Sequence, residues 1–245
     1  MGVMDKNAVL IGFAGFCKSD IILYLSRILY VSGEKVAVID KSNEQELSFS
    51  VPGENSEERI EYRGIDFYLG FGNTSLDYVP LNKYSVVLVD FGVNTEVYED
   101  IPYLKVLFIV TDCNRCHTIP LSAWLKNLTV NIDSIRIIRD ITPGKIRPGY
   151  IDSLLQADQV TNLIAGYEFH LNDMEYSTRL ISQYDDIFRF TRIPQDYRSM
   201  LIDCMTEIFE KDRKASLKAL NKALLGGLEL QVSFWSNYHQ LGTTS

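Results

Sequence analysis

Short runs of consecutive apolar residues recur along this chain, separated by polar or helix-periodic segments. The runs are Ala8–Phe13, Lys35–Asp40, Ile65–Leu69, Val86–Asp90, Val106–Thr111 and Ser134–Ile138. A strand that is apolar at consecutive positions is buried on both faces, which is typical of parallel sheets covered by helices on both sides. The pattern therefore predicts an α/β fold with a doubly wound, mainly parallel sheet.

Helical spacing of apolar residues fills several of the intervals. It predicts helices over Asp20–Val31, Ile119–Leu128 and Ile151–Leu163, and an almost continuous helix over Tyr197–Leu225. The polar segment Lys41–Arg63 is expected to be a surface excursion with a short helix. Because no repeat or linker-like composition interrupts the chain, we expect one domain over 1–245, with 210–245 as its C-terminal helix and tail.

Composition excludes several classes of protein. Hydrophobic residues make up 46% and charged residues 23%, the balance of a globular chain rather than a disordered one. With 24 Lys+Arg against 32 Asp+Glu, the net charge of -8 repels phosphate backbones, so no nucleic-acid partner is expected. No apolar run approaches the roughly 18 residues of a membrane-spanning helix. Four cysteines in 245 residues form no disulfide framework, which favours a cytoplasmic location.

The segment from Gly12 to Ser19 has the spacing of a phosphate-binding loop. Such a loop needs small residues so that backbone N–H groups can surround phosphate oxygens, a lysine for the terminal phosphates and a hydroxyl for Mg²⁺. Gly12, Gly15, Lys18 and Ser19 keep that spacing between a predicted strand and a predicted helix, whereas Cys17 stands where glycine is expected. The alternative is a glycine-containing turn that binds nothing.

Two predicted strands deliver a carboxylate at their carboxyl ends. Val86–Asp90 ends in Asp90, where a parallel sheet places ligands and where a carboxylate could support a bound Mg²⁺ through its water. Asp40 ends the strand about twenty residues after the loop. The alternative for each is an ordinary turn or helix-capping aspartate.

Together these features resemble the MinD/ParA-type deviant Walker-A ATPases, which include cell-division, plasmid-partition and pilus-localisation (TadZ-like) factors. The resemblance extends from Ala8 to about Phe209. The family's signature lysine matches Phe13, the glycine after it matches Ala14, and its usual second acidic residue after the strand-end aspartate matches Ser42.

The resemblance implies a fold of the P-loop type and a site for ATP or ADP with Mg²⁺. The positions that match the family's nucleotide contacts are Gly12, Gly15, Cys17, Lys18, Ser19 and Asp20. The positions that match its Mg²⁺ site are Ser19 and Asp90, and those that match its catalytic groups are Lys18 and Asp40. Arg139 and Asp140 stand where the family often has an asparagine near the base, so the identity of the base stays open.

The departures predict slow or absent ATP hydrolysis. Phe13 removes a cation that offsets charge developing on the phosphates, and Ser42 cannot act as a carboxylate that orients water. Two functions remain open. One is a nucleotide-dependent positioning switch that recruits a pilus, secretion, division or partition component; the other is a pseudo-ATPase scaffold that binds no nucleotide. A conventional hydrolase is the third alternative.

The segment Cys113-Asn114-Arg115-Cys116-His117 has the pattern of a c-type haem attachment site. Haem attachment requires export, for which the sequence carries no signal. A redox-active cysteine pair and a metal site are further alternatives, and a plain loop after a strand is the simplest one.

Two surfaces are candidates for contacts with partners. Residues 213–225 form a basic amphipathic helix that could lie at the inner face of the membrane, dock on a protein, or pack on the core through its leucines. Leu228–Ser245 is expected to be a strand or partner-binding tail. Phe13 and Phe16 are expected to be exposed in the loop, which predicts a homodimer that forms without nucleotide.

Overall fold

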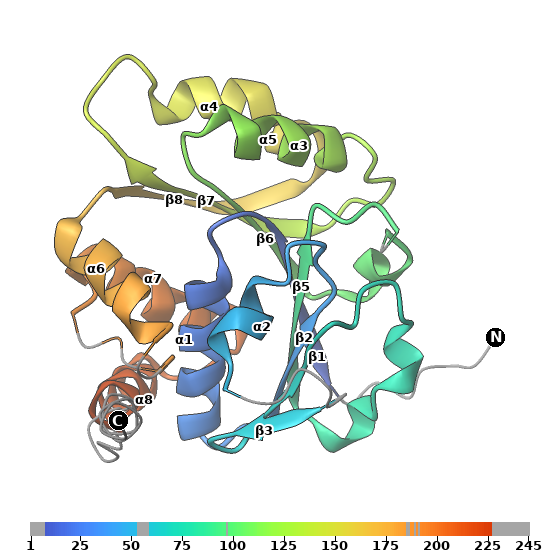
Figure 1. Ribbon diagram of the computed structural model, residues 1–245, viewed down its shortest axis with the longest axis vertical. Coiled ribbons are helices and arrows are strands. Elements are labelled where there is room, and N and C mark those ends of the chain that lie inside the picture. Colours follow the sequence, from blue (N-terminus) through green and yellow to red (C-terminus); the bar gives the residue numbers. More distant parts are fainter. Residues whose placement is uncertain are drawn as a thin grey trace, which may run out of the picture.

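A single sheet forms the centre of the computed structural model, which describes residues 8–52, 59–96, 98–184, 187–188, 190 and 192–226 (Figure 1). Its eight strands have the order β3-β4-β2-β5-β1-β6-β7-β8. β3 is antiparallel to β4, and all other neighbours are parallel. The strands are β1 Val9–Gly15, β2 Val36–Asp40, β3 Ile60–Tyr62, β4 Ile65–Tyr68, β5 Val86–Gly92, β6 Val106–Thr111, β7 Asp133–Ile141 and β8 Asn162–His170. The predicted α/β class is confirmed.

Helices cover both faces of the sheet, and each face has its own apolar core. The helices are α1 Ser19–Val31, α2 Glu46–Ser50, α3 Arg115–Leu125, α4 Pro148–Leu155, α5 Ala157–Val160, α6 Asp173–Ser182, α7 Gln195–Asp203 and α8 Arg213–Gly226. One core joins the sheet to α1, α7 and α8, and the other joins it to α3, α4 and α5 (Figure 1). β2, β5 and β6 are buried at every residue, because their alternate side chains enter the two cores.

Several helix boundaries differ from the sequence prediction. α3 begins at Arg115 rather than Ile119 and ends at Leu125 rather than Leu128. The helix predicted over Ile151–Leu163 is wrong in its second half, because a left-handed Gln156 separates α4 from α5 and the chain then enters β8. β8 is an edge strand with mostly exposed or half-buried residues, so it lacks the continuous apolar run that marks the inner strands.

The predicted helix over Tyr197–Leu225 is interrupted. α7 continues into a π-helical turn, Cys204–Ile208, and α8 begins only at Arg213. α8 packs against α1 and buries Leu220 and Leu224, while Leu217 is exposed. The core-packing alternative for this helix is therefore the one observed, and most of the leucine stripe is not available to a membrane.

No helix in the described part of the chain is long and apolar enough to cross a bilayer. The tail expected over Leu228–Ser245 lies outside the described residues.

Candidate functional site

A sharp turn at the carboxyl edge of the sheet links β1 to α1. Gly15 ends β1 with φ +101°, and a Cβ atom there would lie 2.0 Å from the carbonyl oxygen of Val110. Only glycine fits this backbone. Cys17 follows with φ 55°, a left-handed conformation that is uncommon for a residue with a side chain. The turn lies where open α/β sheets bind ligands.

Gly12 lies within β1 rather than in the turn. A Cβ atom on Gly12 would come within 2.4 Å of Leu104 and 2.9 Å of Phe91. Close packing against these two side chains is therefore enough to explain a glycine at this position.

Phe13 is not exposed, contrary to the sequence expectation. It belongs to β1, is 0% exposed, and its ring stacks on Phe108 with a centroid distance of 4.8 Å. Phe16 is half-buried and stacks on His117 at 4.5 Å. Both rings pack within their own subunit, so they do not form the apolar patch from which the homodimer was predicted.

Lys18 and Asp90 form a buried ion pair. The Lys18 ammonium lies 3.0 Å from the Asp90 carboxylate, and the two side chains are 1% and 0% exposed. Burial alone would lower the pKa of Lys18, but the charge of Asp90 raises it above its usual value. Burial raises the pKa of Asp90, Lys18 lowers it and nearby Asp40 raises it, and the net result is a pKa of about 7.

Asp40 and Asp90 are neighbours across β2 and β5, since they are paired in the strand register. Ser42 donates to Asp40 from its backbone N–H at 3.0 Å and from its hydroxyl at 2.6 Å. Burial raises the pKa of Asp40 although these hydrogen bonds lower it. Within the described residues, the second carboxylate oxygen of each aspartate is buried without a hydrogen-bond partner. These two oxygens could accept hydrogen bonds from water bound to a cation.

Asp20, in the first turn of α1, is part of a second buried charge cluster. Arg139 of β7 donates to its two oxygens at 2.6 and 3.0 Å, and the Tyr197 hydroxyl donates to it at 3.0 Å. Arg139 also donates to Glu175 of α6 at 2.7 Å and to the carbonyl oxygen of Cys17 at 2.7 Å. Burial raises the pKa of Asp20, but Arg139 outweighs this and holds it below its usual value. We call Asp20, Arg139, Glu175 and Tyr197 the Arg139 cluster.

A cavity of about 510 Å³ opens in front of the turn. Cys17 and Ser19 line it, but Lys18 and Asp90 do not. Its described lining has one cationic side chain and four carboxylates, namely Arg179, Asp20, Glu46, Asp112 and Asp140. The Ser19 hydroxyl donates to Glu46 at 3.2 Å. A polyphosphate is an anion, so a lining with four carboxylates and one guanidinium repels it rather than attracts it.

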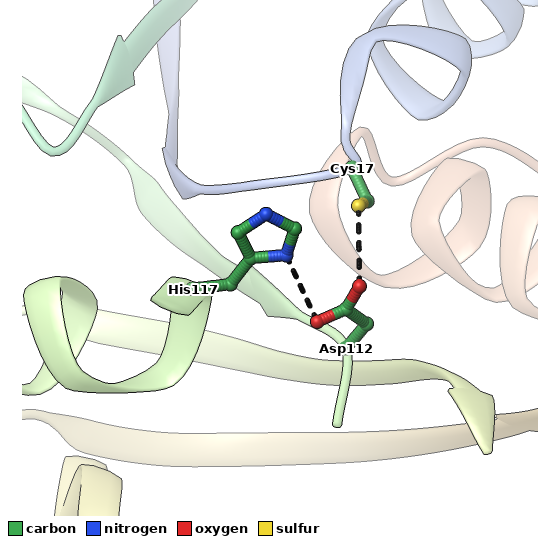
Figure 2. A group of neighbouring side chains, drawn as sticks. All are labelled: Cys17, Asp112 and His117. Carbon is green, nitrogen blue, oxygen red and sulfur yellow. Dashed lines mark hydrogen bonds and ion pairs between the residues drawn. The ribbon is translucent and has the colours of Figure 1, made fainter. Parts of the chain in front are cut away.

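The Cys113–His117 segment is divided between two environments. Its cysteines are free thiols, with Cys113 partly buried against the core and Cys116 exposed in α3. His117, in the first turn of α3, places its Nδ1 atom 2.9 Å from Asp112, and the Cys17 sulfur lies 3.7 Å from the other oxygen of Asp112 (Figure 2). Burial, together with Asp112, raises the pKa of the Cys17 thiol to about 12. No sequence pattern connects Cys17 with His117, which lies one hundred residues further along the chain.

Comparison with known proteins places this site in a recognised fold. A scan against protein-family models and a search of curated proteins found no match. The structure of a ParA family ATPase from Chlorobium tepidum TLS is similar, with a TM-score of 0.54 and 13% identity over 89% of this chain and 99% of that one. A chain of the MinC:MinD cell division protein complex of Aquifex aeolicus gives a TM-score of 0.59 and 12% identity over 84% of this chain and 97% of that one. The structure of Cyanothece apo McdA gives a TM-score of 0.52 and 12% identity over 87% of this chain and 99% of that one. The chain therefore has the ParA/MinD-like fold.

Proposed function

We propose that this protein is a ParA/MinD-like positioning or assembly protein that binds a nucleotide weakly and hydrolyses it slowly or not at all. The observation that carries this proposal is the Lys18–Asp90 pair, which holds a cation and a strand-end carboxylate directly beside the turn between β1 and α1. The fold of the similar structures supports the assignment to this class of proteins.

Nucleotide binding would require Lys18 to leave Asp90 for the phosphates. α1 begins without a side-chain cap, so the N–H groups of its first turn can face an anion. Ser19 lines the cavity and would be a ligand for Mg²⁺, and the unpartnered oxygen of Asp90 would accept from water on that ion. The metal would offset phosphate charge, while Lys18 and Ser19 would orient the nucleotide.

Slow hydrolysis follows from two positions. Phe13 points into the core, so β1 offers no cation here to a nucleotide on the same or a second subunit. Ser42 is held by Asp40 and supplies no carboxylate to orient water. Removing a single electrostatic contact to a transition state typically costs on the order of 10²–10³ in rate.

The alternative function is a scaffold that binds no nucleotide, and the acidic cavity favours it. Asp20 lies in the first turn of α1, where its charge opposes an anion at the helix N-terminus. Cys17 adds a side chain where the backbone would have to approach a phosphate. Under either proposal the partner is a protein component of a localised assembly. A homodimer remains part of the proposal, but it would have to use a surface other than Phe13.

Calorimetric titration with ATP and Mg²⁺ tests the proposal. We expect weak binding by the wild type that is lost in Lys18→Ala and kept in Lys105→Ala, whose lysine forms an exposed pair with Glu210 at 3.4 Å. If none of the three proteins shows a binding signal at millimolar nucleotide, the scaffold function is the correct one. Phosphate release near 1 per second that disappears in Lys18→Ala would show that hydrolysis is not impaired.

A further inference from the structure

Three side chains with different donor atoms meet beside the turn. The ligand atoms of Cys17, Asp112 and His117 all lie within 4.8 Å of one another (Figure 2). Cys17 comes from the turn between β1 and α1, and the other two come from the junction between β6 and α3. They meet because β1 and β6 are parallel neighbours whose carboxyl ends are adjacent.

The sulfur–oxygen spacing in this cluster is close to that of a tetrahedral metal site. Zinc–sulfur and zinc–oxygen bonds of about 2.3 and 2.1 Å, at a tetrahedral angle, separate sulfur from oxygen by about 3.6 Å. The Cys17 sulfur is 3.7 Å from one oxygen of Asp112, Oδ2. The Nδ1 atom of His117 lies 2.9 Å from the other oxygen, Oδ1, so metal binding requires His117 to move outward by about half an ångström and the carboxylate to turn one oxygen toward the metal.

Neighbouring groups already orient two of the three ligands. Asn114 donates to both oxygens of Asp112, from its backbone N–H at 2.8 Å and from its side-chain amide at 2.6 Å. The Phe16 ring stacks on His117 with an interplanar angle of 15°, which fixes the plane of the imidazole. Support of this kind around metal ligands strengthens binding by limiting their motion.

The surroundings favour a cation and leave room for a further ligand. Cys17 and Asp112 line the cavity of about 510 Å³, together with the carboxylates of Asp20, Glu46 and Asp140. Two of the three ligands, Cys17 and Asp112, lie on the cavity wall, so a metal held by the three side chains would keep a position open toward the cavity for water or an anionic ligand.

We propose that Cys17, Asp112 and His117 bind a single divalent transition-metal ion, with Zn²⁺ as the ion that this sulfur, oxygen and nitrogen set fits best. A thiolate and an imidazole disfavour Mg²⁺ and Ca²⁺, which prefer oxygen ligands. Binding releases the Cys17 thiol proton to solvent and leaves a metal–thiolate bond. Its three ligands differ from Ser19 and Asp90, the residues of the proposed Mg²⁺ position, and it is tested with the metal alone.

Titration of the full chain with Co²⁺, followed by displacement with Zn²⁺ in competition with a chromophoric chelator, tests the proposal. The wild type is expected to bind one equivalent of Co²⁺ with a thiolate-to-cobalt charge-transfer band. Cys17→Ser should abolish that band and weaken Zn²⁺ binding by roughly 100-fold or more, and His117→Gln should weaken it by at least roughly 10-fold. Circular dichroism and thermal melting of the metal-free variants confirm that each is folded.

Matched controls separate this site from the neighbouring thiols. Cys113→Ser, Cys116→Ser and His170→Ala should keep both the band and the affinity of the wild type. If the band survives in Cys17→Ser but is lost in Cys113→Ser or Cys116→Ser, the metal belongs to the Cys113/Cys116 pair and the proposal is wrong. The absence of stoichiometric Zn²⁺ and Co²⁺ binding by the folded wild type would also overturn it.

Discussion

Two buried charge clusters flank the start of α1, and they are built differently. In the described part of the chain, Lys18 forms one ion pair, with Asp90 at the centre of the sheet. Asp20, two residues later, is fixed in the Arg139 cluster, where one guanidinium holds two carboxylates and a backbone carbonyl. Lys18 can therefore exchange Asp90 for a ligand by breaking one ion pair. Arg139 would have to break its contacts with several groups at once.

This difference separates a potentially functional charge from a structural one. The pKa of Asp90 is about 7 with Lys18 beside it, and releasing Lys18 removes an attraction that lowers this pKa, so the carboxylate can then accept a proton. Removing Arg139 takes from the buried Asp20 the arginine that pairs with it, and leaves Glu175 with the longer contact to Arg179 at 3.9 Å. The Arg139 cluster also joins β7, α6 and α7 to the turn, so we expect it to hold the C-terminal half of the chain against the N-terminal half.

Arg139→Met is the strongest test of this comparison. We expect the free energy of unfolding to fall by about 3–5 kcal/mol, because the substitution breaks the buried ion pair of Asp20 and removes the closer of the two arginines at Glu175. Urea denaturation measures this change. The control is Arg213→Met, whose arginine forms an exposed pair with Asp203 and should cost roughly 0–1 kcal/mol. If the free energy of unfolding falls equally in the two variants, the Arg139 cluster does not have the structural role proposed for it.

Lys18→Met should have an intermediate effect. Its loss leaves the Asp90 carboxylate unpaired, which costs about 1–3 kcal/mol when the carboxyl can be neutralised by a proton. The same denaturation experiment, with Lys105→Met as the exposed-lysine control, measures it. A loss as large as that of Arg139→Met would contradict the view that the Lys18–Asp90 pair is the one that can be released.

The pH dependence of stability gives the smallest and most specific signal. Since Asp90 has a pKa of about 7 when folded and an ordinary aspartate value when unfolded, the folded state binds more protons between these values. Asp90 therefore contributes its whole stabilisation at pH values below its pKa in the unfolded state. This stabilisation is lost as the pH rises to and through its pKa in the folded state. From about pH 6 to about pH 7 the loss should be about 1 kcal/mol.

Urea denaturation at about pH 6 and about pH 7 checks this prediction, by comparing how much the free energy of unfolding changes between the two pH values in the wild type and in two variants. Asp90→Asn should remove about that much of the pH dependence, whereas Asp77→Asn, at an exposed position, should leave it unchanged. An unchanged pH dependence in Asp90→Asn would show that the carboxylate is ionised throughout this range.

The sequence by itself determined the inner strands, the turn between β1 and α1, and the positions of Lys18 and Asp90. These features are local: continuous apolar runs mark strands buried on both faces, and Gly15 marks a backbone that only glycine can adopt there. Phe13 was misjudged because the glycine spacing is compatible with a loop that starts earlier, whereas β1 continues to Gly15.

Only the tertiary structure decided which side chains meet. Strand order is not encoded in periodicity, so the placement of β1 between β5 and β6 could not be inferred residue by residue. That placement brings Asp90 to Lys18 on one side and Asp112 with His117 to Cys17 on the other. The contact of Arg139 with Asp20 likewise joins residues 119 positions apart, and it depends on the packing of β7 and α6 around the start of α1.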